Sequence, residues 1–330
     1  MQKKLIALAV AGLVSVPAFA QSNVTIYGRL DAGLFNKDDA EGNAVTRVDS
    51  SGWTTSRLGF KGAENLGNGL QALFQVETKL VNDDDTGLTG QARDTFVGLA
   101  GGFGAVLLGR LSSPLNSWLA DFDHAEGAPY FKVTNVGQGF LKDAVFETRA
   151  DNTIAYATPN MGGFQAIAYY SFNLMAPETW PSKSEIRVGG IGFRYTAGGL
   201  DAFYTYNNAS KAAEIDNHSL GLSYDFGVAK IMGTYLLTDF DTNADSKQYS
   251  LGVQVPVGAG VISAGFGHEQ NLGGVRDVDQ DTWSIAYKHN LSKRTYLYAG
   301  YQRQDLDFKH PVGESSTARD TYGVGVAHHF

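Results

Sequence analysis

Apolar and polar residues alternate along most of this chain. Near the carboxyl end, Tyr322, Val324, Val326, His328 and Phe330 fall at every second position, with glycine, alanine and histidine among the residues between them. Successive side chains of a β-strand point to opposite faces, so this spacing predicts a strand with one apolar face and one face of small or polar residues.

Similar alternation recurs throughout the sequence and predicts about 16 strands. The expected strands begin near Val24, Thr54, Leu70, Arg93, Ala105, Arg149, Phe164, Ile186, Leu200, Ser219, Val228, Lys247, Val261, Thr282, Thr295 and Asp320. Few segments have the spacing of a helix. The pattern therefore predicts an all-β chain with one domain and no linker.

The connections between these strands fall into two classes that alternate along the chain. The short, turn-rich connections are 65–69, 101–104, 159–163, 197–199, 225–227, 257–260 and 290–293. The long and polar connections are 36–51, 81–91, 112–148, 173–185, 208–216, 238–246, 269–280 and 304–318. Short turns on one side and long loops on the other are typical of an antiparallel transmembrane β-barrel, whose apolar face meets lipid.

Residues 112–148 form the longest connection, and about 37 residues without a strand pattern are too many for an ordinary loop. Within this connection, Pro114–Asp121 is compatible with a short helical turn. Two interpretations are open. The connection either folds into the lumen as a constriction or forms a surface-exposed flap, and its length favours the functional, inward-folded segment.

Residues 1–20 have the pattern of an export signal. Two lysines near the start precede an apolar run, Leu5–Val16, which is too short to span a bilayer. An A-x-A cleavage pattern, Ala18–Ala20, stands directly before Gln21. We therefore expect cleavage of the signal rather than a retained membrane anchor, and we expect 21–330 to form the barrel domain.

The composition narrows the possible functions. The formal net charge is -8 at pH 7, which argues against nucleic acid as a partner. The chain has no cysteine, so the stability of the exported protein must come from the sheet and not from disulfides. The patterns G-x-S-x-G, H-E-x-x-H and Walker A are absent from the sequence. The sequence thus predicts neither an enzyme nor a cofactor.

Two acidic runs carry oxygen ligands of the kind that calcium prefers, Asp83–Asp85 and the alternating aspartates of 277–281. Hydrated external loops are the simpler interpretation of both runs. His328 and His329 are neighbours on one expected strand and point to opposite faces, which argues against a joint metal site.

The alternation also predicts which side chains face the lumen, because a basic charge facing lipid at the midplane costs roughly 2–4 kcal/mol. On the strand that begins near Arg93, Phe96 and Gly98 are expected to face lipid, which directs Arg93 and Thr95 inward. The charged residues assigned to the inside include Arg29, Arg57, Lys61, Glu77, Arg93 and Arg149. Several arginines on neighbouring strands favour a positive field in a pore over solvated charges at a rim.

A series of motifs follows the order of a known family over nearly the whole mature chain. The motifs are Val24–Gly33, Ser56–Leu70, Phe96–Gly104, Leu108–Arg110, Tyr156–Phe164, Ser223–Lys230, Val255–Gly260, Leu291–Ala299 and Gly325–Phe330. With them the chain resembles the general porins of the neisserial and beta-proteobacterial type. The resemblance implies a trimeric, 16-stranded barrel in the outer membrane of a Gram-negative bacterium, with a third external loop folded into the lumen.

The resemblance further implies passive diffusion of small hydrophilic solutes and inorganic ions past a basic cluster on the barrel wall. The expected constriction consists of Arg57, Arg93 and Arg149, with Arg29 and Lys61 beside them, and of the opposing acids Glu77, Asp121 and Asp123. We expect a preference for anions, because fixed charges act within about 8–10 Å at physiological salt. The expected partners are further copies of this chain in a homotrimer, the lipids and lipopolysaccharide of the outer membrane, and the permeating solutes.

Two other functions are less consistent with the sequence. A substrate-specific channel, for instance for sugars, would need a ladder of aromatic side chains along the lumen, whereas the candidates Tyr27, Tyr169, Tyr296 and Tyr298 are scattered. A barrel enzyme such as a lipase or protease would need a nucleophile and a base at one rim, and the sequence has no such grouping. General diffusion is therefore the favoured function.

Overall fold

The structure is a computed structural model, and it describes residues 23–38, 43–85, 87–88, 91–134, 149–174, 186–211, 214–241, 243–310 and 313–330. The expected export signal, 1–20, lies outside these residues. Within the described part, no helix has both the length and the apolar character needed to cross a membrane.

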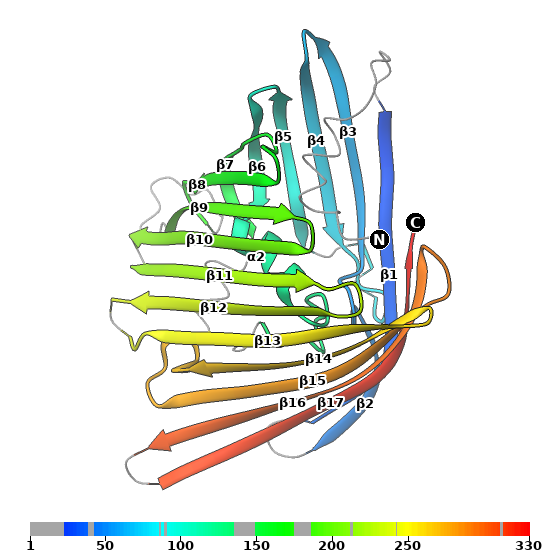
Figure 1. Ribbon diagram of the computed structural model, residues 1–330, viewed down its shortest axis with the longest axis vertical. Helices are drawn as coiled ribbons and strands as arrows, with labels where there is room; N and C mark the ends of the chain where they lie inside the picture. Colours follow the sequence, from blue (N-terminus) through cyan, green and yellow to red (C-terminus); the bar gives the residue numbers. More distant parts are fainter. Residues whose placement is uncertain are drawn as a thin grey trace.

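Strands make up most of the described chain (Figure 1). They are β1 (Asn23–Asp38), β2 (Ala44–Ser50), β3 (Arg57–Gly67), β4 (Leu70–Lys79), β5 (Ala92–Gly101), β6 (Gly104–Ser112), β7 (Arg149–Ala157), β8 (Phe164–Ser171), β9 (Ile186–Ala197), β10 (Leu200–Lys211), β11 (Ile215–Asp225), β12 (Lys230–Phe240), β13 (Ser246–Val257), β14 (Gly260–Gln270), β15 (Val278–Asn290), β16 (Thr295–His310) and β17 (Gly313–His329). The helical elements are α2 (Pro114–Trp118), η1 (Leu119–Phe122) and η2 (Leu272–Gly274). Most strands begin within a few residues of the expected starts.

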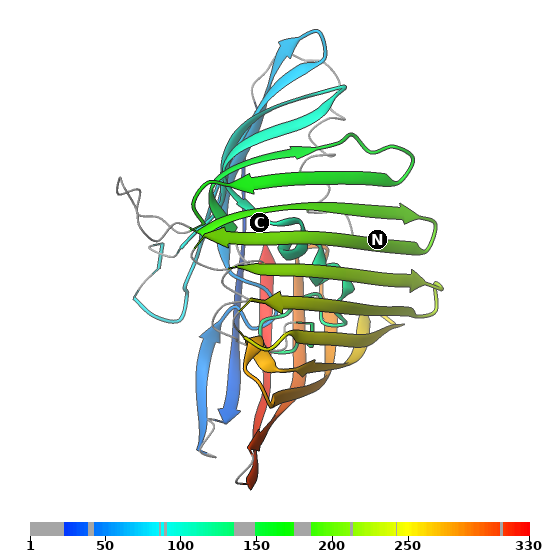
Figure 2. The same cartoon turned by 90° about the vertical axis from the view of Figure 1, so that its left-hand side faces the viewer.

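Hydrogen bonding between the first and last strands closes the sheet into a barrel. From β3 to β17, each strand pairs antiparallel with the next, as the neighbouring hairpins in Figure 2 illustrate, and β1 pairs with β17 from Arg29 opposite His329 to Lys37 opposite Thr321. β2 and β3 both pair with β1, β2 along its second half and β3 along its first half. These two strands share one position, so the 17 strands form a closed 16-stranded antiparallel barrel, as predicted.

A bend at residues 51–56 interrupts the second position of the barrel. Asp31 on β1 holds this bend, because its carboxylate accepts hydrogen bonds from the backbone N–H groups of Gly52, Trp53 and Thr54 at 2.8–3.1 Å. The Tyr298 hydroxyl on β16 donates to the same carboxylate at 2.5 Å. A buried carboxylate thus ties three parts of the chain together, and four charge-assisted hydrogen bonds compensate for its burial.

Three of the expected long loops are shorter in the structure. The expected loop 36–51 contains β2, while β10 extends to Lys211 and β16 to His310. Strand pairing continues past the apolar band, where water meets both faces of a strand and the apolar–polar alternation ends. Backbone pairing therefore continues in segments whose sequence reads as polar loop.

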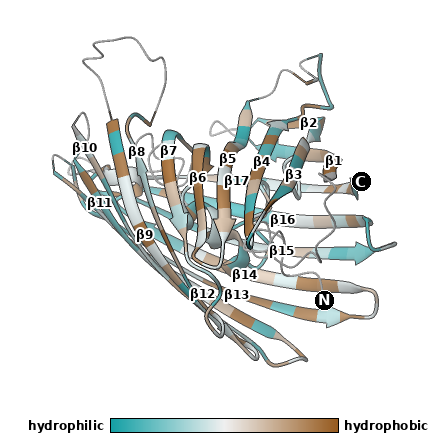
Figure 3. Ribbon diagram, turned by 90° about the horizontal axis from the view of Figure 1, so that it is seen from above, coloured by the Kyte–Doolittle hydropathy of each residue, from teal (hydrophilic) through white to brown (hydrophobic). Residues whose placement is uncertain are grey.

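The outer face of the barrel is apolar. Large side chains such as Ile26, Leu251 and Val324 are more than half exposed there, and the residues between them are mostly buried. Hydrophobic and hydrophilic stretches alternate along the ribbons in Figure 3. Exposed rows of apolar side chains suit a surface that lies in lipid. Closure of the sheet also suits lipid, because it leaves no strand edge with unpaired backbone groups.

We predict that Phe330 completes the barrel seam. The backbone groups of Gly28 and Phe330 exchange two hydrogen bonds of 3.0 and 3.1 Å, and a Cβ at Gly28 would collide with the Phe330 ring. Deleting Phe330 removes the hydrogen bonds and the ring, so the amount of folded barrel in the membrane fraction should fall. The Phe330→Ala variant keeps both hydrogen bonds and should give an intermediate amount. Equal amounts of folded barrel in all three proteins would contradict this role.

Candidate pore-lining site

Glu77 lies at the centre of a basic cluster on the inner wall. One of its carboxylate oxygens is 2.5 Å from Arg93 Nε and 3.5 Å from Arg57 Nη1. The other accepts a hydrogen bond from the Tyr27 hydroxyl at 2.9 Å. The strands β1, β3, β4 and β5 therefore bring these four side chains together. Both carboxylate oxygens of Glu77 have partners among them.

The remaining predicted basic residues lie around this centre. Arg149 Nε is 3.4 Å from a carboxylate oxygen of Asp94, and Arg29 donates to the Thr54 hydroxyl at 2.5 Å. Lys61 Nζ lies 5.1 Å from the centre of the Tyr27 ring. Arg57 is subject to the like charges of Arg29, Arg93 and Arg149. The cluster thus combines five basic residues (Arg29, Arg57, Lys61, Arg93, Arg149) with three acids (Glu77, Asp94 and Asp31 beside Arg29), which leaves an excess of positive charge.

The predicted side-chain orientation of β5 is wrong for the residues that follow Arg93. Val97 and Leu99 are exposed on the outer face, whereas Phe96 packs beside an inner apolar cluster. The register of β4 and β5 shifts between Val76 and Thr78, so β5 has one extra residue opposite Glu77. This β-bulge reverses the alternation. It lets Arg93 reach Glu77 while Phe96 and Gly98, which were expected to face lipid, belong to the inner face.

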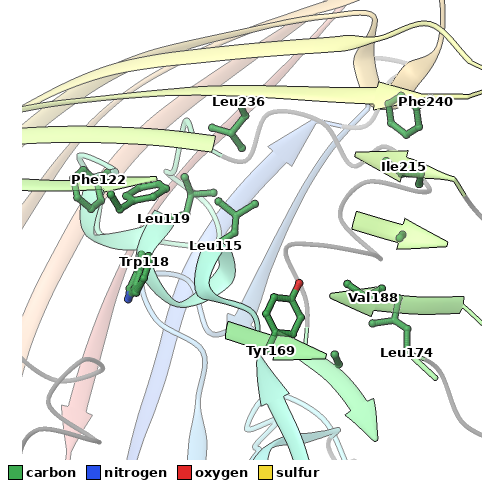
Figure 4. Close-up of a cluster of buried hydrophobic side chains, with 13 residues drawn as sticks. Leu115, Trp118, Leu119, Phe122, Tyr169, Leu174, Val188, Ile215, Leu236 and Phe240 are labelled. Carbon is green, nitrogen blue, oxygen red and sulfur yellow. The ribbon is translucent and has the colours of Figure 1, made fainter. Parts of the chain in front are cut away.

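Residues 113–122 pack against side chains of β8 to β12. The Ser113 hydroxyl caps α2 by accepting from the Asn116 N–H at 3.0 Å, and Pro114 follows at the first helical position. Leu115, Trp118, Leu119 and Phe122 project from α2 and η1 into one apolar cluster (Figure 4). The strand residues labelled in that cluster are Tyr169, Val188, Ile215, Leu236 and Phe240, with Leu174 beside β8.

Residues 123–134 continue along β13 to β16, where polar wall side chains bind the backbone of the segment. Gln254 donates to the His124 carbonyl and Gln302 to the Lys132 carbonyl, both at 2.7 Å. The Ser284 hydroxyl donates to the Phe131 carbonyl at 2.6 Å. These hydrogen bonds satisfy buried carbonyl groups that would otherwise lack partners.

The imidazole of His124 is buried against Ser284. Its Nε2 lies 2.6 Å from the Ser284 hydroxyl oxygen, and the single hydroxyl proton of Ser284 is directed to Phe131, so Nε2 carries the proton and donates. The ring is completely buried, and burial lowers the pKa of His124 below its usual range, although the nearby Asp123 carboxylate acts in the opposite direction.

The acidic residues of this segment do not face the basic cluster. Asp121 lies 2.8 Å from Arg194 on β9, and Glu126 lies 2.5 Å from Lys288 on β15. Asp123 is buried, and its carboxylate accepts from the N–H groups of Ala125, Val133 and Thr134 at 2.8–2.9 Å. The expectation that Asp121 and Asp123 oppose the arginines is therefore corrected, because Asp121 pairs with the opposite wall and Asp123 folds its own segment.

Sequence reasoning missed Arg194, Lys288 and Asp94. Alternation could have found the first two, since Arg194 stands beside the outward-facing Tyr195 and Lys288 beside the outward-facing Tyr287. Asp94 sits at the bulge, where alternation fails. Among the described residues, no group of three histidine or acidic side chains could hold a metal ion. In the run 277–281, the partners of Asp279 and Asp281 are Lys309 and His268.

The chain is similar to a set of known proteins. Residues 7–309 match the model of a family described as Gram-negative porin. The chain is 36% identical to outer membrane porin protein 32 of Delftia acidovorans, over 90% of this chain and 88% of the relative. It is 28% identical to major outer membrane protein P.IB of Neisseria meningitidis serogroup B over the full length of both. Among solved structures, an anion-selective porin from Comamonas acidovorans matches with a TM-score of 0.78 and 30% identity, over 94% of this chain and all of that chain.

We predict that Asp123 stabilises the segment that carries it. The Asp123→Ala variant leaves three buried N–H groups without their acceptor, so the free energy of unfolding should fall by about 1–3 kcal/mol. Asp83→Ala, at an exposed external position, is the matched control and should leave it unchanged. Urea titration of the refolded barrel, followed by gel mobility, measures both. Equal unfolding curves for the two variants would contradict the assigned role.

Proposed function

Because the chain belongs to the Gram-negative porin family, it forms a passive diffusion channel in the outer membrane and is no enzyme, and we propose that this channel prefers anions. One observation carries the proposal. The basic cluster on β1, β3, β4, β5 and β7 groups five basic residues with the acids Glu77, Asp94 and Asp31, while the acids of the segment 113–134 are bound elsewhere. The solved porin with 30% identity to this chain is described as anion-selective, which supports the same preference.

The proposal includes a constriction between that wall and the segment 113–134, folded into the lumen. Contacts of this segment with inward-facing side chains from β8 to β16 support the placement. In this arrangement, solutes pass between the segment and the basic cluster of Arg57, Arg93 and Arg149. The opposite side of the passage then consists of the segment itself.

The ion preference of the channel depends more on where the charged residues lie than on the net charge of the chain. The whole chain is acidic, at -8, but fixed charges are largely screened beyond roughly 8–10 Å at physiological salt. Asp121 and Glu126 each face a basic side chain on β9 or β15 and so contribute little net field. Glu77 and Asp94 offset only part of the arginine charge. Arginine stays protonated at any working pH, so the preference should persist across the neutral range.

The inward tyrosines do not favour a sugar-specific channel. The Tyr298 hydroxyl binds Asp31, and the buried Tyr169 hydroxyl binds Asn207 at 3.0 Å. Tyr27 donates to Glu77. Their hydroxyl groups are engaged in the wall, and their rings do not form a continuous ladder. This supports general diffusion of small hydrophilic solutes and ions.

We further propose that three copies of the chain assemble in the membrane, surrounded by lipid and lipopolysaccharide. The outer face carries a shallow apolar groove of about 870 Å³ over β1, β2 and β13 to β17. Leu34, Ile262, Ile285, Tyr322 and Val324 line it. The groove adjoins Ile26, Leu30 and Val326 on the first and last strands, whose exposed side chains can pack against a neighbouring barrel.

The reversal potential in a salt gradient tests the selectivity. We predict anion preference in the wild type and a permeability ratio that falls by roughly twofold in each of the variants Arg57→Ser, Arg93→Ser and Arg149→Ser, because each removes one charge from the passage. Arg47→Ser is the control, since Arg47 is mostly exposed and pairs with Asp49 away from the cluster. Cation preference in the wild type, or equal ratios in all variants, would overturn the proposal.

Native mass measurement in mild detergent tests the assembly. We predict the mass of three chains, and we expect Val324→Asp to reduce it because a carboxylate would enter the apolar outer face. Thr46→Asp, at the polar end of the same groove, serves as the control. A monomer mass for the wild type at every protein concentration would exclude the trimer.

A further inference from the structure

Four glycines on the inner wall lie directly beneath large side chains of the segment 113–134. A Cβ at Gly192 would lie 2.6 Å from the Trp118 ring, and a Cβ at Gly300 would lie 2.7 Å from the Phe131 ring. At Gly252 and Gly265 a Cβ would lie 2.8 Å from His124 Cβ and from His124 Cγ. Real Cβ atoms do not approach neighbours this closely, so only glycine allows the segment to lie where it does.

The two glycines beneath His124 are direct partners in the sheet. Gly252 on β13 stands opposite Gly265 on β14, and Gly265 stands opposite Ser284 on β15. The same row thus provides a flat place for the ring and the hydroxyl that binds it. Glycine in a strand interior weakens the strand and often marks the close approach of another group. Here that group is the buried His124.

We propose that Gly192, Gly252, Gly265 and Gly300 form a seat, the glycine seat, that sets the distance between the segment and the wall and thereby the cross-section of the pore. The inference rests on the proposed position of the segment in the lumen. It makes these glycines positioning residues for permeation, although none of them carries a charge or contacts a solute.

Two features decide which part moves if the glycine seat is filled. The wall cannot yield, because the backbones of β13, β14 and β15 are hydrogen-bonded to strands on both sides. The segment stays attached through Asp121–Arg194 and Glu126–Lys288. An added side chain therefore lifts the segment away from the wall and narrows the passage. Pore diameter in turn controls conduction and the size of solutes that pass.

A size-exchange experiment tests the glycine seat. Single-channel conductance is recorded for Gly265→Ala, for His124→Ala and for the double variant in symmetric potassium chloride. Gly265→Ala should lower the conductance by about 1.5-fold to twofold, and the double variant should return to the value of His124→Ala, because removal of the ring makes room for the methyl group. Gly233→Ala on β12 is the matched control, since Gly233 stands between the outward-facing Leu222 and Leu251 and should tolerate the change.

The pair Gly300→Ala and Phe131→Ala repeats the comparison at a second point. Folding of each variant is checked first by its heat-dependent gel mobility. If Gly265→Ala or Gly300→Ala does not fold alone, its double variant should fold, and a double variant that folds no better overturns the proposal. A wild-type conductance in both single glycine variants, an increase in conductance, or an equal decrease in Gly233→Ala would also overturn it. Cation preference in the wild type, by contrast, would overturn the anion proposal and leave this result intact.

Discussion

Complete pairing of backbone hydrogen bonds is the constraint on which the rest of this structure depends. A bilayer offers no water to unpaired N–H and C=O groups, so a sheet in lipid has to close on itself. Here β1 closes it by pairing with β17. Closure fixes an outer and an inner face, and alternation along each strand then directs apolar side chains to lipid and leaves charged ones to the inside. The basic cluster lies on that inner face, and side chains of β8 to β16 contact the segment 113–134.

The pairing of charged residues differs between the two sides of the barrel interior. From β8 to β16 the strands contact the segment 113–134, whose acids are paired with Arg194 and Lys288 or, at Asp123, with its own backbone. From β1 to β7 the arginines stay grouped around Glu77. Placement of the acids is therefore as important for the sign of the field as the number of arginines, and an acidic chain can present a positive passage.

Much of the fold and part of the site could be predicted from alternation alone. The strand starts and the inward direction of Arg29, Arg57 and Glu77 follow from it, because lipid selects apolar residues at every second position. The prediction fails where a contact outside the strand pattern determines the direction of a side chain or the path of the backbone. The bulge opposite Glu77 reverses β5, Asp31 holds the bend at residues 51–56 through three N–H groups, and Asp123 turns back onto its own segment. The apolar–polar alternation does not encode these contacts.

Anomalous diffraction from crystals soaked in rubidium bromide tests the central claim, a positive inner wall whose acids are already paired. The account predicts bromide sites beside Arg57, Arg93 and Arg149, and no rubidium beside Glu77, since Tyr27 and two arginines occupy that carboxylate. Rubidium on this wall, or an absence of bromide from it, would contradict the account.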